Sequence, residues 1–277
     1  MWDAGLVSDK NELGDFLRSR RERVDAQDAG VIDTTRRRVT GLRREELALL
    51  AGLSASYYAR LEQGRDRNPS PEVLEALAAA LRLDAAERRY LQTLALPSLD
   101  TSGGGVDGST VRSGVQQLFR RWVGLPAFVV TPSRDVVAAT SLARRVNPAW
   151  AEGMNLVRFT FTDPRARATY PDWADIAAQA VAGLRASAAD HPQMVEPLVD
   201  EMRHSSDAFR QLWDRRDVLT RTVGIKRIRI ADVGIVGLDY ETFTVSGSEG
   251  QALYVYFPPE GSESERVLES VTSRPGG

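Results

Sequence analysis

Residues 43–64 read RREELALLAGLSASYYARLEQG, and this stretch decides the fold of the N-terminal half. Gly52 lies near its middle, where a glycine tolerates the positive φ of a tight turn between two steeply crossing helices. Small and apolar residues at helical spacing suit the touching faces of both helices. They are Leu47, Ala48 and Ala51 before the glycine, and Tyr58 and Leu61 after it. The stretch therefore predicts a helix-turn-helix unit.

The remainder of residues 1–96 predicts a small all-α domain of about five short helices. Ser70 followed by Pro71 is a strong helix start, because a capping hydroxyl precedes a proline at the first helical position. Asp84 with Glu87 has the spacing of a capping box. An apolar stripe near residue 13 is expected to face away from a set of exposed arginines. The set is Arg18, Arg20, Arg21 and Arg23.

Residues 97–110 are rich in Gly, Ser and Thr without apolar periodicity, which predicts a flexible linker to a second domain at 111–277. That domain is mixed. Strands are expected at 127–131, 135–140, 221–230, 235–245 and 252–257, and helices from 171, at 193–203, at 207–214 and after 262. Two strands, then helices, then three strands is typical of an α+β domain with one antiparallel sheet and helices on one face.

The composition excludes several classes of function. The chain has 277 residues and a net charge of −2, so any binding to nucleic acid must come from a local basic patch. It contains no cysteine, which excludes disulfides, thiolate metal sites and thiol nucleophiles. No segment is apolar over the roughly 18 residues of a membrane span, and the N-terminus has no secretory pattern. We therefore expect a cytoplasmic protein without membrane contacts.

Several segments resemble a known family. RREELA at 43–48, AGLS at 51–54, YYARLEQG at 57–64 and PS at 69–70 are similar to the Cro/phage-repressor-like (XRE) helix-turn-helix family. An arm ending in TGLRREE at 40–46 is typical of the MmyB-like transcriptional regulators of actinobacteria. Segments of the second half resemble the ligand-binding domain of that family. They are 155–158, 163–164, 172–173, 184–185, 206–209, 212–213, 233–234 and 259–262. The resemblance covers about residues 11–272 and implies a PAS-like fold for the second half.

Two positions depart from the family pattern. Thr140 follows the second predicted strand, where the family usually carries Asn, and Ala231-Asp232 stands where it often has His-Pro. Neither departure changes the expected fold, but both bear on whether the family's pocket chemistry applies to this chain.

The second helix of the motif is expected to read a double-stranded DNA operator. Arg60 lies one turn beyond the helix start and can donate bidentately to a guanine edge. Ser54, Ser56 and Tyr57 are expected to contact phosphates or base edges. Four arginines are expected to position the duplex through its phosphates: Arg43, Arg44, Arg65 and Arg67. Arg36, Arg37 and Arg38 of the arm are expected to enter a minor groove or follow the backbone, and for each arginine the alternative is a solvated surface role. Glu62 is expected to brace the helix pair, because phosphate repels a carboxylate. A homodimer is expected, since such motifs bind paired half-sites.

The resemblance implies that the second half binds an apolar effector such as a fatty acid, without a cofactor or metal. Large aromatic side chains concentrate there and can line a pocket, with ordinary core packing as the alternative for each. They are Trp122, Phe128, Trp150, Phe159, Phe161, Trp173, Phe209 and Trp213. An effector of this kind would act by favouring one DNA-binding arrangement over another.

Two other classes of function remain open. One is a second half that serves only for dimerisation or protein interaction, and the other is an enzyme with a DNA-binding extension. The enzyme interpretation has little support. A G-x-G-x-x-G string at 103–108 lies in the predicted linker without a preceding strand, and the two histidines have no catalytic or metal-binding spacing. We therefore predict a DNA-binding transcription regulator that is not an enzyme.

Overall fold

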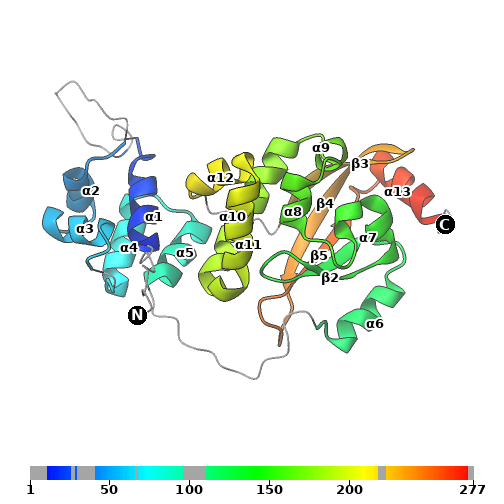
Figure 1. The fold of residues 1–277 in the computed structure, drawn as a ribbon, viewed down its shortest axis with the longest axis horizontal. Coiled ribbons are helices and arrows are strands. Elements are labelled where there is room, and N and C mark those ends of the chain that lie inside the picture. Colours follow the sequence, from blue (N-terminus) through cyan, green and yellow to red (C-terminus); the bar gives the residue numbers. More distant parts are fainter. Residues whose placement is uncertain are drawn as a thin grey trace, which may run out of the picture. The chain divides into compact units, whose positions relative to one another are not determined.

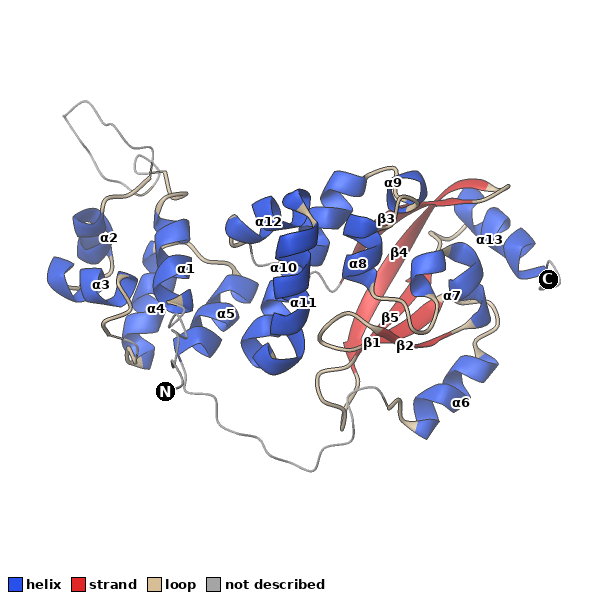
Figure 2. Ribbon diagram, in the orientation of Figure 1, coloured by secondary structure: helices blue, strands red, loops and turns tan. Residues whose placement is uncertain are grey.

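The computed structural model describes residues 11–25, 29, 41–66, 68–95, 110–217 and 223–273 (Figures 1 and 2). The chain divides into two compact units between residues 100 and 101, and each is described by itself. The predicted linker lies outside the described residues except for Thr110. No helix among the described residues is long and apolar enough to span a membrane.

The N-terminal unit is helical, as predicted. Its described residues form α1 (Glu12–Arg21), α2 (Arg44–Leu50), α3 (Ala55–Glu62), α4 (Pro71–Ala80) and α5 (Ala85–Ala95). The predicted caps are present: the Ser70 hydroxyl accepts from the Val73 amide, and Asp84 and Glu87 form the reciprocal bonds of a capping box. Side-chain caps therefore fix where α1, α3, α4 and α5 begin, which sets the direction of their apolar faces.

The core of this unit joins α1 to the helix-turn-helix pair. Phe16 and Leu17 of α1 are buried with Leu47 of α2 and Leu61 of α3. The Phe16 ring meets the Tyr90 ring of α5 edge-on at 5.1 Å. Since α1 lies against both α3 and α5, it fixes the direction in which α3 presents its exposed face.

The C-terminal unit contains one antiparallel sheet of five strands in the order β2-β1-β5-β4-β3. The strands are β1 (Ala127–Val130), β2 (Val136–Ala139), β3 (Val223–Ile230), β4 (Gly234–Thr244) and β5 (Ala252–Phe257). This is the α+β architecture expected for the second half.

The β3–β4 turn places Asp232 at φ 59°. Proline cannot adopt this angle, so the turn of this chain is not compatible with a proline at position 232.

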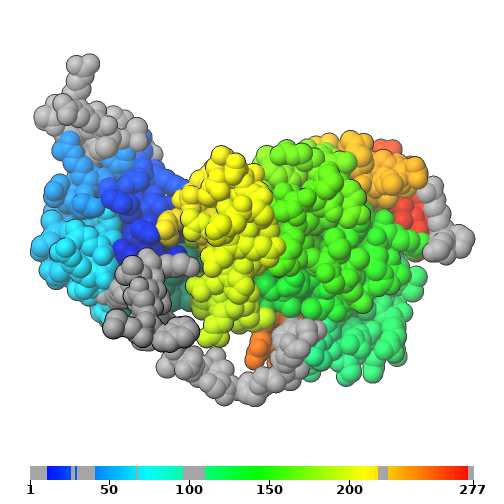
Figure 3. All heavy atoms as spheres, viewed as in Figure 1, coloured from blue at the N-terminus to red at the C-terminus, as the bar shows by residue number. Residues whose placement is uncertain are grey.

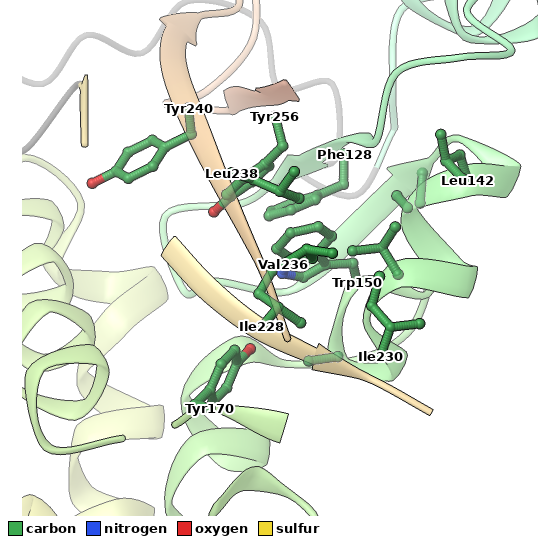
Figure 4. Packing of buried hydrophobic residues seen from close by; sticks show 14 of the residues in the cluster. Phe128, Leu142, Trp150, Tyr170, Ile228, Ile230, Val236, Leu238, Tyr240 and Tyr256 are labelled. Carbon is green, nitrogen blue, oxygen red and sulfur yellow. The ribbon is translucent and has the colours of Figure 1, made fainter. Parts of the chain in front are cut away.

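Most helices of the unit lie on one side of the sheet (Figure 2). Those that pack on its inner face are α7 (Ser141–Val146), a short 3-10 helix (Pro148–Trp150), α8 (Leu156–Thr162), α9 (Ala166–Thr169), α10 (Trp173–Asp190) and α13 (Glu263–Ser273). Helices α11 (Pro192–Ser205) and α12 (Asp207–Asp214) pack instead on α8 and α10, around a separate cluster of buried residues. On this inner face Phe128, Trp150 and Tyr256 form an aromatic stack, with Trp150 and Tyr256 centroids 4.2 Å apart (Figure 4).

One helix departs from the expected arrangement on a single face. Helix α6 (Ser113–Arg121) packs on the outer face, where Phe119 meets Val129 and Val255.

The hydroxyl of Thr140 caps α7 by accepting from the Ala143 amide at 3.3 Å. A threonine therefore supplies the capping oxygen that an asparagine would supply at this position.

Candidate DNA-binding surface and ligand-binding cavity

Helices α2 and α3 form the predicted helix-turn-helix. Gly52 has φ 67° in the turn, and a Cβ built at this glycine would meet nothing within 4 Å. The requirement for glycine is therefore one of backbone angle and not of space. The amide of Leu53 donates to the Ala48 carbonyl at 2.8 Å, and the Ser54 hydroxyl accepts from the Tyr57 amide at 3.2 Å. These bonds end α2 and begin α3 with four residues between them.

The exposed face of α3 carries the side chains predicted to contact DNA. Ser54, Ser56 and Arg60 are exposed, and Tyr57 is half-buried. The Arg60 guanidinium lies 5.5 Å from the centre of the Tyr57 ring, and its Nη2 is 4.0 Å from a carboxylate oxygen of Asp66. Both contacts are loose, and the Arg60 side chain is 49% exposed, so its donors are accessible to a ligand on this face.

The opposite side of α3 is fixed by an ion cluster around Glu62. Glu62 is buried, and Arg21 of α1 donates to its two oxygens at 3.0 and 3.1 Å. Arg44 of α2 donates to the same carboxylate through Nε at 3.0 Å. Burial acts to raise the pKa of Glu62, but the bonds from Arg21 and Arg44 outweigh it and hold that pKa below its ordinary value. The predicted bracing role of Glu62 is confirmed, and it ties together the first three helices.

The predicted arginines divide into three groups. Arg43 and Arg65 are exposed next to the helix-turn-helix. Arg44 is bound to Glu62, which leaves its Nη1 without a bond to any described residue. The remaining predicted arginines lie outside the described residues. They are Arg36, Arg37, Arg38 and Arg67.

Two arginines of α1 were expected on its exposed side, but the structure buries them. Arg20 and Arg21 are only 5% and 9% exposed. Arg20 pairs with Glu87 of α5 at 3.1 Å, as Arg21 pairs with Glu62. The charge pattern along α1 could not show this, because the pairing carboxylates come from α3 and α5.

The eight predicted pocket aromatics fall into three separate clusters of the C-terminal unit. Phe128, Trp150 and Phe159 lie in the core on the inner face of the sheet, and Trp173 packs at its edge. Phe161, Phe209 and Trp213 belong to a second cluster among α8, α10, α11 and α12. Trp122 lies on the outer face beside α6. The structure therefore does not bring all eight to one cavity, and Trp122 is separated from the others by the sheet.

A partly open cavity of about 540 Å³ lies where α8, α9 and the start of α10 meet the α11–α12 junction. In Figure 3 the yellow surface of α11 and α12 lies beside the green surface of the residues that precede α10. Phe161 and Trp173 are the two predicted aromatics that line it, with ring centres 6.0 Å apart. Trp173 is held by a bond from Nε1 to the Thr160 carbonyl, and the Arg167 guanidinium stacks on its ring at 3.8 Å.

No group of three or more His, Asp or Glu side chains in the described part of the chain is placed to hold a metal ion. His191 and His204 lie at the two ends of α11, one before its first residue and one in its last turn. Neither histidine is therefore part of a catalytic constellation with the other.

Comparison with known proteins agrees with this geometry. A model described as "Helix-turn-helix domain" matches residues 12–91, so the N-terminal unit is of the DNA-binding helix-turn-helix class. A model of the "MmyB-like transcription regulator ligand binding domain" matches residues 111–270. The chain belongs to this family: it is a DNA-binding transcription regulator with a ligand-binding domain, a class that is generally not enzymatic.

The chain is also similar to one solved structure, titled "Structure of an RNA-binding Light-Oxygen-Voltage Receptor", at 9% identity and a TM-score of 0.27. The match covers 83% of this chain and spans 56% of the length of that one. A search of curated proteins found no match.

Proposed function

We propose that this chain binds a specific operator as a homodimer and responds to a small apolar ligand, such as a fatty acid, in its C-terminal domain. The observation that carries the proposal is the exposed face of α3, where Tyr57 and Arg60 lie one turn apart while Glu62 fixes the opposite side. The DNA-binding domain comprises residues 1–96, the linker 97–110 and the ligand-binding domain 111–277. The regulator works in the cytoplasm, at the nucleoid.

The proposed DNA contacts follow from exposure and charge. Arg60 reads a guanine edge, because its guanidinium is half-exposed and lies in the last turn of α3, the helix proposed to enter the major groove. Ser54, Ser56 and Tyr57 contact phosphates or base edges. Arg43, Arg44 and Arg65 position the duplex through phosphates, Arg44 with the nitrogen that Glu62 does not use. Arg67 and the arm residues 36–38 add contacts to the backbone or minor groove.

Arg60→Ala tests the reading of DNA by α3. We expect selection from a random duplex library, followed by fluorescence anisotropy, to show a loss of about 1–3 kcal/mol and relaxed preference at one base pair. The matched control is Arg89→Ala, which removes the same charge from an exposed position on α5. An Arg60→Ala protein with unchanged affinity and unchanged preference would contradict the assignment.

Ligand sensing is supported by the cavity and the aromatic side chains around it. About 540 Å³ lies within the range typical of small-molecule sites, and Phe161 and Trp173 form its apolar part among polar residues such as Thr162, Asp163 and Ser206. A ligand there contacts α10, α11 and α12 together, so it can favour one arrangement of these helices. Native mass spectrometry tests the proposal directly. A discrete extra mass that extracts into organic solvent supports it, whereas protein that binds no lipid favours a domain used only for dimerisation.

The homodimer is supported by an apolar face that the described residues leave uncovered. Ile225, Ile235, Phe243 and Phe257 point away from the core on β3, β4 and β5, with exposures of 37–69%. Asp239 lies among them and forms no ion pair with a described residue, and cationic Arg229 lies on the same face. Opposite charges within an apolar face suit a second copy related by a two-fold axis.

Phe243→Glu tests this surface, since Phe243 is 52% exposed and its loss leaves the core unchanged. We expect sedimentation to show monomers at a concentration where the wild-type chain is dimeric. Leu49→Glu, at an 81% exposed apolar position on α2, is the control and should stay dimeric. A Phe243→Glu protein with wild-type sedimentation would place the interface elsewhere.

A further inference from the structure

Helix α6 lies in a part of the chain with a local excess of positive charge. Residues 108–134 contain no Asp or Glu, whereas Arg112 directly precedes α6 and Arg120 and Arg121 form its last turn. The chain as a whole has a net charge of −2, so this excess is a property of the segment and not of the composition. A patch of one sign attracts partners of the opposite sign.

One face of α6 is used for packing. Val115, Phe119 and Trp122 recur at helical spacing and lie against the outer face of the sheet, in a cluster with Val129 and Val255. All members of this cluster are apolar, so it contains no carboxylate that could balance the arginines. The packing also fixes which face of α6 is turned toward solvent.

The solvent-facing side of α6 carries hydrogen-bond donors. Ser113, Gln117, Arg120 and Arg121 are exposed, and successive members lie within one helical turn of each other. None of these four side chains forms an ion pair or a hydrogen bond with a described residue. The face therefore presents two positive charges and two neutral donors that the fold does not use.

Other arginines of the C-terminal unit are bound within the fold. Arg158 of α8, for example, pairs with Glu201 of α11 at 2.7 Å. Arg112, just before α6, donates through Nη1 to the Ser246 carbonyl at 2.6 Å, which ties it to the turn between β4 and β5. The two arginines in the last turn of α6 have neither kind of partner among the described residues, so their donors are available to a ligand.

The position of α6 in the chain keeps it close to DNA that the N-terminal domain binds. Ser113 begins α6 18 positions after Ala95 ends α5, as 113 minus 95 gives. A chain of this length spans at most about 60–65 Å, which is nearly two turns of a DNA duplex. Binding of a tethered group is intramolecular, so even weak contacts of α6 with the same duplex add to the affinity.

We propose that the exposed face of α6 binds the phosphate backbone of the DNA that flanks the operator. The inference rests on DNA binding by α3 and adds a second contact from the C-terminal unit, one that does not read sequence. Arg120 and Arg121 supply the charge, and Ser113 and Gln117 donate to phosphate oxygens. DNA is favoured over an acidic protein surface because Leu118 is the one large apolar side chain exposed on α6, and protein interfaces have an apolar core.

Two duplexes distinguish a flanking contact from reading of the operator. One contains only the library-selected operator, and the other extends it by about two helical turns on each side. We expect the double variant Arg120→Gln, Arg121→Gln to bind the long duplex at least about fivefold more weakly than wild type, and the short duplex equally well. On the long duplex the slope of log K against log salt should become shallower by about 1.8, since each phosphate contact contributes about 0.9. Base preference should not change, in contrast to Arg60→Ala.

The matched control is the double variant Arg210→Gln, Arg266→Gln, which removes two exposed positive charges from α12 and α13. It should bind both duplexes as wild type does, which excludes an effect of net charge. Sedimentation of the α6 variant should match wild type, whereas weaker DNA binding together with dissociation of a dimer would assign α6 to the dimer interface and overturn the inference. Wild-type affinity of the α6 variant for the long duplex would overturn the flanking contact and leave reading by α3 intact. Binding of neither duplex by the wild-type chain would overturn both.

Discussion

Replacing Glu62 with Gln tests how the helix-turn-helix is held. The substitution keeps the shape of the side chain and removes the charge that binds Arg21 and Arg44. Arg21 is then left 9% exposed without its carboxylate, while its bond to the Leu42 carbonyl at 2.8 Å remains. The perturbation therefore acts mainly on one buried guanidinium that joins α1 to α3.

The magnitude follows from the burial of the two partners. Removing one member of a buried ion pair costs about 3–5 kcal/mol, because the other charge stays desolvated. The Arg44 side chain is 40% exposed and adds little, and a glutamine oxygen still accepts one bond from Arg21. We therefore expect Glu62→Gln to lower the free energy of unfolding by about 2–4 kcal/mol. The matched control is Glu22→Gln. Glu22 is 59% exposed and lies 3.7 Å from both Arg18 and Arg21 without a close hydrogen bond to either, so the substitution should change stability by less than about 1 kcal/mol.

Denaturation of the full chain, followed by two signals, locates the effect. Four of the five tryptophans lie in the C-terminal half, so their fluorescence reports that unit, while circular dichroism at 222 nm follows helices of both. We expect Glu62→Gln to move the dichroism transition and leave the fluorescence transition in place. The pKa of Glu62 is lowered in the folded protein, so its contribution is present above the unfolded value of about 4.3 and disappears as the pH falls through the folded pKa. A loss equal to that of Glu22→Gln, or one that persists at low pH, would refute the reasoning.

Two further predictions concern the turn of the motif and the inner face of the sheet. Gly52→Ala should lower the free energy of unfolding by about 1–2 kcal/mol in denaturant titration, because alanine is strained at φ 67°. Gly114→Ala in α6, where a Cβ would also meet nothing within 4 Å, should not lower it. Equal effects of the two substitutions would contradict the argument from the backbone angle. Lys226 faces Arg134, Tyr240, Tyr254 and Tyr256, and its pKa is lowered to about 8 in the folded protein. In the unfolded chain this lysine keeps its proton up to about pH 10.4. The unfolded state therefore binds more protons than the folded state above about pH 8. For this reason the stability of wild type relative to Lys226→Met should rise by about 1–2 kcal/mol between about pH 7.5 and 9.5. A stability difference that does not change with pH would show that Lys226 is solvated.

Local sequence signals were sufficient for much of the fold. The five N-terminal helices follow from caps and apolar spacing, such as Ser70 with Pro71, whose effect is confined to one turn. The long strands β3, β4 and β5 follow from alternating apolar residues, since one face of the sheet is buried and the other is not.

The elements between residues 141 and 169 were not predicted, because tertiary contacts decide them. Helix α8 contains Phe159, Thr160 and Phe161, which are residues typical of strands. It is helical because the Asn155 side chain accepts from the amides of Val157 and Arg158, both at 3.0 Å, and the helix packs against α10. Such a cap is a single residue, and its effect depends on packing that the local sequence does not contain.

Site residues were predictable where they belong to one helix and not where they come together from several. The exposed face of α3, with Ser54, Tyr57 and Arg60, follows from helical spacing alone. Arg134 acts electrostatically on Lys226, which lies 92 positions further along the chain (226 minus 134), and only the folded sheet brings these two charges near each other. Composition placed the eight aromatics in one half, but it carried no information on which face of the sheet each would occupy.

The central claim is that a ligand in the C-terminal domain alters DNA binding by α3. It is tested most directly by measuring the affinity of the full chain for a library-selected duplex with and without saturating dodecanoate. We predict a change of about fivefold or more in Kd for the wild-type chain. Identical wild-type Kd values with dodecanoate bound and absent would contradict the account.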